Sequence, residues 1–426
     1  MAAVLEGIKV IDLSQVAAAP MCARHLADFG ADVIHIENPR TGDFFRTYLA
    51  SMQELHAAAP SEFDYLWENY NRNKRSATID IAQEDGREVV CRLIEQADVL
   101  VTNLRPFEIE RYRMDYATLS KLNPRLVWAC ITGYGREGPE KNTPSYDASA
   151  LMARSGITHI MSPPGGAGPA FRPAFGDNVA ALAAAFGIML ALYQRETTGR
   201  GQEVDASLLH TGLHLITFDI AGALTTGLDY SDWRDEPPAE AIARVLEARA
   251  PIMAFYAARS RNPIAGVYAT SDARAVLLIA LQPDRYWEKI CRVIGREDLA
   301  TDPRYATFEG RAEHCPELRE ALGAAFLTKT LAEWEALLPG VPYAPYKSLQ
   351  EAVKDPQARA NDFFVATDHP TEGRIEVIAS PVKLGESPAS YRMPAPEFGQ
   401  HTEEVLLECG YDWDDIVRFK EQGIIV

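Results

Sequence analysis

Short apolar runs alternate with amphipathic stretches over the first half of the chain. Helical spacing is found at residues 17–29, with Pro20 in the first turn and Gly30 directly after the last, and again at 84–96. The apolar runs between these stretches are typical of buried parallel strands, and they lie at residues 8–13, 33–36, 77–81, 99–104 and 126–132. This alternation predicts an α/β fold with an open parallel sheet of the dinucleotide-binding type, covered by helices on both faces.

Ligands of such sheets bind at the carboxyl ends of the strands. We therefore expect the functional site in the loops that follow them, at residues 14–20, 37–48, 103–113 and 133–147.

The second half of the chain has a different pattern. Residues 225–265 are acidic and helix-like, 267–281 are typical of a β-hairpin with its turn at Ser271 and Asp272, and 284–335 are helical. Strand signals return at 374–378 and 382–384. We predict a smaller α+β domain at 225–340 and a large domain that is discontinuous in sequence, formed by residues 1–224 and 341–426.

The longest uncharged apolar run is Val179 to Tyr193. A membrane span needs about 20 residues, so this run predicts a buried core helix rather than a membrane anchor. The N-terminus lacks the pattern of a signal peptide. The six cysteines include no CxxC pair, which favours reduced thiols and a cytoplasmic location.

Composition and charge narrow the class of partner. The chain has 426 residues, 47% of them apolar, which is ordinary for a folded protein, and a net charge of −18. This charge disfavours nucleic acid and anionic membranes as partners, but not a small anionic ligand bound by a local basic cluster. HExxH, GxxxxGK[ST] and GxSxG are absent, so zinc-protease, P-loop and hydrolase functions lack their usual motifs.

A glycine-rich stretch follows the last predicted strand. Residues 133–138 match GxGxxG, but Pro139 comes directly afterwards, so the helix that a dinucleotide-binding fingerprint requires has no place to begin. We interpret the stretch as a loop in which glycines such as Gly135 let the backbone approach a ligand closely.

Gly176, Asp177 and Asn178 directly precede the long apolar helix. Asp177 or Asn178 could be the N-cap. Alternatively, Asp177 could be a nucleophile that the helix dipole keeps ionised, with Gly176 leaving the space in front of it open. The residues alone leave both interpretations open.

Three further groups each have a structural and a functional interpretation. The basic run at 71–75 could be a solvated surface or a phosphate contact, with a second basic group at Arg105, Arg111 and Arg113. The aromatic segment 44–70 could pack over the sheet or form a wall for a bulky acyl group. His210 and His214 have metal-pair spacing but no evident third ligand, so we predict no metal site.

Taken in order, these blocks resemble the class III CoA-transferases, the family of formyl-CoA transferase and crotonobetainyl-CoA:carnitine CoA-transferase. The resemblance covers nearly the whole chain, including LEGIKVIDLSQVAAAP (5–20), FGADVIHIENPRTGD (29–43), ADVLVTNLRP (97–106), LNPRLVWACITGYGREGP (122–139) and FGDNVAALAAAFGIMLAL (175–192). It implies transfer of coenzyme A from an acyl-CoA to a carboxylic acid, with acyl-CoA as substrate and no tightly bound cofactor.

The resemblance also implies a mechanism and a set of residues. The nucleophile corresponds to Asp177, which would form a mixed anhydride and then an aspartyl-CoA thioester. Tyr48 would lie near the acyl group, and Gly135, Tyr146 and Gly176 complete the expected substrate pocket. The residues implied to contact CoA are Val16, Ala17, Asn38, Arg40, Ile81, Asn103, Leu104 and Arg111.

Several positions depart from formyl-CoA transferase. Ala17 replaces a glutamine, Asn38 replaces an arginine, and the family's run of four glycines is absent before Tyr268. These departures disfavour oxalate or formate. The small Ala17 and the aromatic segment favour a larger acyl group, so we expect an aromatic or branched carboxylic acid, with succinyl-CoA as one candidate donor.

Two alternatives remain. The α-methylacyl-CoA racemases share the fold and pair the same aspartate with a histidine, but that histidine corresponds to Tyr146 here, and a phenol is a poor base at neutral pH. A non-catalytic partner subunit would be expected to lack Asp177. The resemblance further implies an interlocked dimer, which we expect to be a homodimer, although a heteromer would fit as well.

Overall fold

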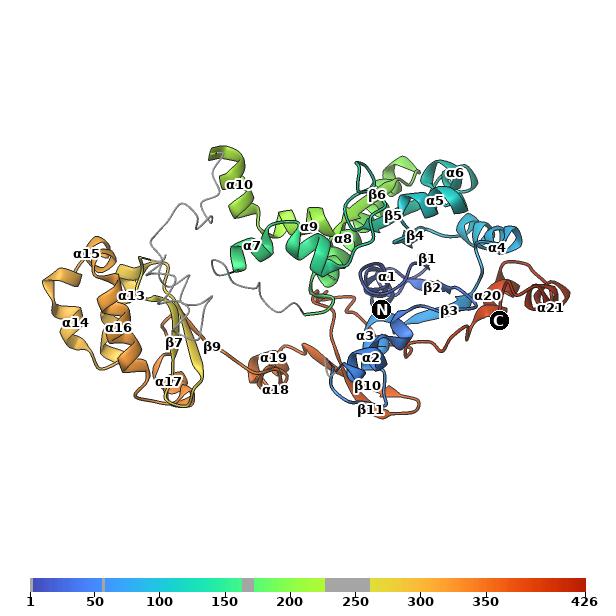
Figure 1. The fold of residues 1–426 in the computed structure, drawn as a ribbon. Coiled ribbons are helices and arrows are strands. Elements are labelled where there is room, and N and C mark those ends of the chain that lie inside the picture. The colour runs from blue at the N-terminus through green and yellow to red at the C-terminus, as the bar shows by residue number, and fades with distance from the viewer. Residues whose placement is uncertain (1–2, 56–57, 163–171, 227–260) are drawn as a thin grey trace. The chain divides into compact units, whose positions relative to one another are not determined.

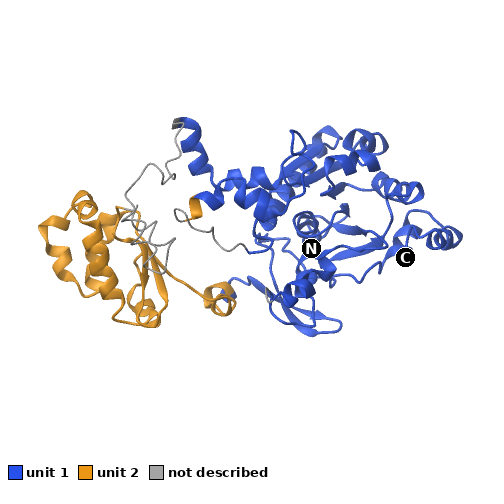
Figure 2. Ribbon diagram, viewed as in Figure 1, with its two compact units in different colours: residues 1–159, 170–229, 359–426 blue, residues 160–169, 230–358 orange. Residues whose placement is uncertain are grey.

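The computed structural model describes residues 3–55, 58–162, 172–226 and 261–426. The acidic stretch expected at 225–265 lies mostly outside the described residues. The described chain divides into two compact units: residues 1–159, 170–229 and 359–426 form the larger unit, and residues 160–169 and 230–358 form the smaller one (Figure 2). The chain therefore returns to the larger unit at Arg359, later than residue 341, where the sequence pattern places the return.

A six-stranded parallel sheet forms the centre of the larger unit, in the order β3-β2-β1-β4-β5-β6 (Figure 1). This agrees with the α/β fold predicted from the sequence, and it is the strand order of dinucleotide-binding sheets. The strands are β1 (Lys9–Leu13), β2 (Asp32–Glu37), β3 (Lys74–Thr78), β4 (Val99–Thr102), β5 (Val127–Thr132) and β6 (Glu203–Ser207).

Neighbouring residues of each strand pack on opposite faces of the sheet. Val10 of β1 belongs to one apolar core with helices α1 (Ala18–Asp28) and α8 (Phe175–Thr198). Ile11 belongs to the other core, which contains residues of α4 (Glu84–Glu95), α5 (Pro106–Tyr112), α6 (Tyr116–Leu122), α20 (Thr402–Glu408) and α21 (Trp413–Glu421). Because α20 and α21 come from the C-terminal segment, that segment completes the cover on this face.

The remaining elements of the larger unit surround the sheet. Two of them, β10 and β11, form an antiparallel hairpin. These elements are α2 (Phe45–Glu54), α3 (Tyr65–Asn71), η1 (Ala148–Ala153), α7 (Ile157–Met161, which continues into the smaller unit), α9 (Leu208–Leu215), α10 (Thr217–Thr226), β10 (Phe364–His369) and β11 (Gly373–Ile378).

The smaller unit has its own apolar core beneath an antiparallel sheet in the order β7-β8-β9. Its hairpin β7 (Ala265–Ala269) and β8 (Ala275–Ile279) turns at the residues predicted from the sequence. The other elements are α13 (Pro283–Val293), α14 (Glu297–Thr301), η3 (Pro303–Tyr305), α15 (Phe308–Glu313), α16 (Cys315–Phe326), α17 (Leu331–Leu337), β9 (Tyr343–Pro345), α18 (Leu349–Ala352) and α19 (Pro356–Ala360, which ends in the larger unit).

Two strand predictions were wrong. The third strand occupies 74–78 rather than 77–81, and Lys74 to Thr78 pair with Val33 to Glu37. Residues 382–384 form no strand; they follow Pro381, and Val382 is half exposed. The short strand β6 was not predicted, because the exposed polar residues Glu203 and Asp205 interrupt its apolar positions.

Both interpretations of the basic run at 71–75 are also wrong for its buried members. Arg72 is 1% exposed and its guanidinium lies 2.9 Å from the Asp28 carboxylate. Lys74, also 1% exposed, has its ammonium 2.9 Å from Asp12. These cations are neither solvated nor available to a phosphate, because acidic residues from elsewhere in the chain neutralise them inside the protein.

Candidate active site

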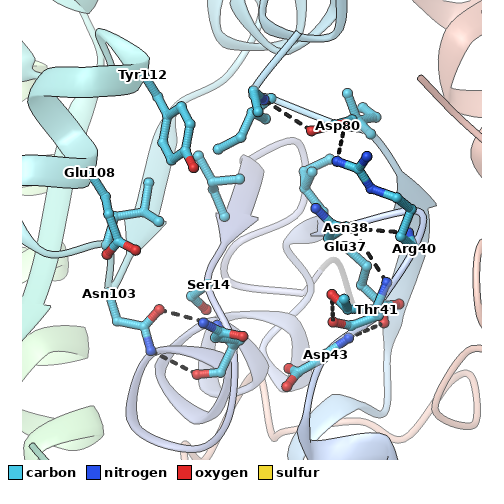
Figure 3. Close-up of a pocket in the computed structure, with 18 of the residues that line it drawn as sticks. Ser14, Glu37, Asn38, Arg40, Thr41, Asp43, Asp80, Asn103, Glu108 and Tyr112 are labelled. Atoms are coloured by element: carbon cyan, nitrogen blue, oxygen red, sulfur yellow. Dashed lines mark hydrogen bonds and ion pairs between the residues drawn. The ribbon is translucent and has the colours of Figure 1, made fainter. Parts of the chain in front are cut away.

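A cavity of about 420 Å³ lies at the carboxyl ends of β1 to β4 (Figure 3). Because all strands are parallel, the loops that follow them meet at this edge of the sheet. Of the residues implied to contact CoA, the cavity brings together Asn38, Arg40, Ile81, Asn103, Leu104 and Arg111. Their role in binding stays a prediction.

Polar groups fix the loop that carries Arg40. The Asn38 side-chain oxygen accepts a hydrogen bond from the Arg40 backbone N–H at 2.9 Å. The Arg40 guanidinium lies 2.9 Å from the Asp80 carboxylate, yet its side chain is 71% exposed. A guanidinium held in place and still accessible is suited to an anionic group on a ligand.

A second cavity, of about 270 Å³, contains Asp177. It is lined by Val16 and Ala17 from the loop after β1 and by Tyr146 from the loop after β5. The two cavities share Gln15, Asn103 and Glu108 in their walls. A long ligand could therefore extend from the Arg40 loop to Asp177.

Asp177 does not cap helix α8, contrary to one sequence-based interpretation. The helix begins at Phe175 after Ala174, whose φ is 61°, and Asp177 lies within the first turn. The N-cap residue is Ala174, and the carboxylate of Asp147, from another part of the chain, accepts the Gly176 N–H at 3.0 Å and the Ala148 N–H at 2.7 Å.

The ionisation of Asp177 also differs from the expectation. Burial, and then the charge of Asp147, raise the pKa of Asp177 to about 7. The helix N-terminus therefore does not hold this carboxylate fully ionised at neutral pH. Like charge and burial raise the free energy of the ionised form instead.

Asp147 is the residue that the sequence analysis missed. It is 7% exposed and precedes η1, a single turn of π-helix. It is adjacent in sequence to Tyr146, which was singled out for a different reason. A buried carboxylate so far along the chain from Asp177 has no local sequence signal, because only the fold brings α8 and η1 together.

The two glycines of the expected pocket have different roles. A Cβ on Gly176 would lie 2.8 Å from the Leu151 side chain and 3.0 Å from the Asp147 Cβ. Gly176 thus allows α8 to pack closely on η1, and it does not open the space in front of Asp177. Gly135 has a φ of +99° and lines neither cavity, although Gly133 lines the second.

The aromatic segment 44–70 packs into the core of the larger unit, and its role as a wall for an acyl group stays a prediction. Phe45 and Tyr70 are buried in the core beside α1 and α8, and the Tyr70 hydroxyl donates to the Asn178 side-chain oxygen at 2.9 Å. Tyr48 stacks on Phe45 with ring centroids 5.3 Å apart. Burial, and then the charges of Asp147 and Asp177, raise the pKa of Tyr48, but Tyr48 lines neither cavity.

No group of three or more His, Cys, Asp or Glu side chains is arranged to hold a metal ion among the residues that the structure describes. His210 and His214 both lie on α9. Besides Asp177 and Tyr146, the second cavity is lined by the cationic side chains of Arg105 and Lys141.

The sequence is similar to proteins of a known family. Residues 5–402 match the model of CoA-transferase family III. A relative from Clostridioides difficile, (R)-2-hydroxy-4-methylpentanoate CoA-transferase, is 32% identical over 99% of both chains. Cinnamoyl-CoA:phenyllactate CoA-transferase from Clostridium sporogenes is 31% identical, covering 99% of this chain and 97% of the relative. A formyl-CoA:oxalate CoA-transferase from Rhodopseudomonas palustris is also 31% identical over 100% of this chain and 98% of its own.

The fold has a counterpart of known structure. The crystal structure of a CAIB/BAIF family protein from Brucella suis matches with a TM-score of 0.75 and 26% sequence identity, covering 96% of this chain and all of that one.

Proposed function

Because the chain belongs to CoA-transferase family III, and is thus an enzyme that transfers coenzyme A between an acyl-CoA and a carboxylic acid, we propose that Asp177 is its nucleophile. One observation carries the assignment: Asp177 lies in a cavity whose walls are shared with the larger cavity beside Arg40. A CoA thioester extended along both cavities would bring its acyl carbon to the Asp177 carboxylate.

The proposed reaction conserves the thioester bond energy through covalent intermediates. The Asp177 carboxylate attacks the acyl carbon of the donor, which forms a mixed anhydride and releases the CoA thiolate. The thiolate attacks the Asp177 carbonyl of the anhydride, which releases the donor acid and leaves an aspartyl-CoA thioester. The acceptor carboxylate attacks this thioester to give a second anhydride, and the returning thiolate takes the acceptor acyl group and frees Asp177.

The environment of Asp177 supports this role. Burial and the charge of Asp147 raise its pKa to about 7, and a carboxylate of higher basicity is a better nucleophile.

We propose an aromatic or branched carboxylic acid as the acceptor. Ala17 leaves room in the second cavity, and the Tyr48 ring lies close enough to Asp147 and Asp177 for both charges to affect its pKa. Two of the relatives act on a branched and an aromatic hydroxy acid by name. The formyl-CoA:oxalate relatives make oxalate the substrate to test against. Succinyl-CoA stays a candidate donor.

We also propose that the enzyme is a cytoplasmic homodimer in which a second copy covers α8. By length and composition this helix could span a membrane, but it packs through Ala180, Ala184 and Ile188 into the core. Its other face exposes apolar side chains, namely Leu182, Phe186, Met189, Leu190 and Tyr193. Apolar surface of this kind is typical of an interface. The proposed homodimer is the interlocked dimer that the family resemblance implies.

Mass spectrometry tests the nucleophile directly. The protein is incubated with branched, aromatic and succinyl acyl-CoAs and with formyl-CoA, quenched with hydroxylamine, and digested. We expect a hydroxamate on Asp177 in the wild type and none in Asp177→Ala, while CoA binding measured by calorimetry stays near the wild-type value. Retained turnover in Asp177→Ala would overturn the assignment. Exchange of an α-proton in deuterium oxide without any adduct would indicate a racemase instead.

A further inference from the structure

The backbone at Val16 is in a strained conformation. Its φ is 71°, in the left-handed region that β-branched residues rarely occupy. Such a conformation persists only when the surrounding structure holds it, and it is common at functional sites. The groups that hold Val16 therefore determine the shape of whatever this turn lines.

Asp43 and Asn103 hold the turn through its backbone. The Val16 N–H donates to both carboxylate oxygens of Asp43, at 2.9 and 3.2 Å. The preceding residue, Gln15, is bound through both its backbone groups: its N–H donates to Asn103 at 3.1 Å and its carbonyl accepts from Asn103 at 2.7 Å. Figure 3 shows Asn103 and Asp43 with Ser14 between them.

Asp43 is itself fixed by buried partners. It is 2% exposed, and it accepts the Phe45 N–H at 2.8 Å. The Nε2 atom of His35 lies 3.4 Å from an Asp43 oxygen, and the Nδ1 atom of the same ring lies 2.9 Å from Asp12. Asp12 in turn is 2.9 Å from the Lys74 ammonium.

The charges of this chain of contacts balance when His35 is protonated. Asp12 and Asp43 then face Lys74 and the His35 imidazolium. Burial opposes protonation of His35, but the Asp12 charge, the hydrogen bond to Asp12 and the contact with Asp43 outweigh it and raise the pKa to about 9. The His35 ring therefore lies between Asp12 and Asp43, and these contacts fix the position of Asp43.

The turn lies at the junction of the two cavities. Val16 lines the cavity of Asp177, and Gln15 lines both. We propose that Asp43 is a positioning residue for the transfer reaction: by holding Val16 in its left-handed conformation, it sets the wall against which the reacting thioester lies beside Asp177. This inference rests on the proposed function for the reaction, but the holding of the turn does not.

Asp43→Asn is the informative variant because it keeps the size and one acceptor oxygen. Its amide NH₂ replaces an oxygen that faces N–H donors and the His35 ring, so the turn should relax. Val16→Gly removes the backbone strain at this position without removing the N–H group that donates to Asp43, because glycine adopts a positive φ without steric cost. Asp28→Asn is the matched control: Asp28 is also buried and paired, with Arg24 and Arg72, and it lines neither cavity.

Two measurements are made on the full-length protein. Hydrogen–deuterium exchange of the peptide around residues 14–18 reports on the turn without any substrate. The rate of Asp177 hydroxamate formation is measured as a function of acyl-CoA concentration. This gives a maximal rate, comparable to kcat, and a half-saturating concentration, the KM-like term. We expect Asp43→Asn to increase exchange in this peptide and to lower the maximal rate by about 100-fold, the size typical of a misplaced reacting group. In the Val16→Gly background the same substitution should lower the rate only about tenfold.

The control and the two Asp43→Asn measurements give results that either support or overturn the proposal. Asp28→Asn should reduce stability while leaving exchange of this peptide and the maximal rate near wild type. The proposal is overturned if Asp43→Asn leaves exchange unchanged, if it raises only the KM-like term, or if its effect is equal in the wild-type and Val16→Gly backgrounds. If the wild type forms no Asp177 adduct with any acyl-CoA, the proposed function fails, and the exchange data still decide whether Asp43 holds the turn.

Discussion

Two clusters, each with a pair of carboxylates, border the candidate active site, and they differ in how their charge is balanced. In the first, Asp12 and Asp43 lie against Lys74 and His35. In the second, Asp147 lies near Asp177, and the charge that acts most on Asp177 is the like charge of Asp147. The first cluster has cations within contact distance, whereas in the second Asp147 accepts the backbone N–H groups of Gly176 and Ala148.

The difference separates structural from reactive carboxylates. Lys74 and His35 outweigh the effect of burial and hold the pKa of Asp12 well below its usual range, so this group keeps its charge and contributes to stability. Asp177 has its pKa raised to about 7, so its ionised form is high in free energy and gains most from forming a covalent bond. Four substitutions test this contrast.

The largest effect is expected for Asp177→Asn. Removal of the proposed nucleophile should lower kcat by about 1000-fold or more. Because the ionised carboxylate is unfavourable in the fold, the same substitution should raise the melting temperature at pH 8 by about 2 °C. Calorimetry and the transfer assay check the two effects. Asp115→Asn, at the N-cap of α6, is the control and should leave kcat unchanged. A lower melting temperature in Asp177→Asn would contradict the contrast.

Lys74→Met should lower the stability of the protein, whereas Asp177→Asn should raise it. It leaves the Asp12 carboxylate buried without its ammonium partner, which costs about 3–5 kcal/mol of unfolding free energy. Urea unfolding followed by circular dichroism measures the loss. Adding Asp12→Asn should recover part of the stability, because it removes the unpaired charge. If Lys74→Met alone were neutral, the first cluster would not be a charge-balanced one.

His35 should make stability depend on pH. Its pKa is about 9 in the folded chain, above the ordinary 6.5. The stability that it contributes is therefore fully present below pH 6.5 and is lost as the pH rises through about 9. We expect His35→Gln to lower the unfolding free energy by roughly 3 kcal/mol at about pH 6, and by much less above about pH 9. A gap between wild type and variant that stays constant with pH would show that His35 is neutral.

The local pattern of apolar residues predicted most strands of the sheet. It failed where residues far apart in the sequence neutralise each other's charge. The strands that contain Ile11, Ile34, Leu100 and Val127 were predicted because apolar runs alternate with helical spacing. The third strand was placed three residues late, because Lys74 looks like a surface residue until Asp12, 62 positions earlier, neutralises it.

The same reason limits what could be predicted of the site. Asp177 was singled out as a candidate because a Gly-Asp pair precedes a long apolar helix, a local signal, and its role as nucleophile was implied by the family resemblance. Its high pKa was not, since the wrong sign was inferred from the helix dipole alone. Asp147 and the Asp43–His35 contact were missed because each is a pairing between different elements of the fold, and neither leaves a spacing pattern in the chain.

The smallest effect is expected for Asp147→Asn, and it tests the second cluster directly. The substitution keeps an oxygen that can accept the Gly176 N–H, so α8 should remain in place. It removes the charge that, after burial, raises the pKa of Asp177. The rate should rise with pH through about 7 in the wild type, because the ionised carboxylate is the nucleophile, and the rise should occur at lower pH in the variant. At about pH 8 Asp177 would be mostly ionised in both the wild type and the variant, so kcat should differ between them by no more than about threefold. A pH–rate profile with an unchanged midpoint would mean that burial alone sets the basicity of Asp177, and that the like charge of Asp147 has no part in its reactivity.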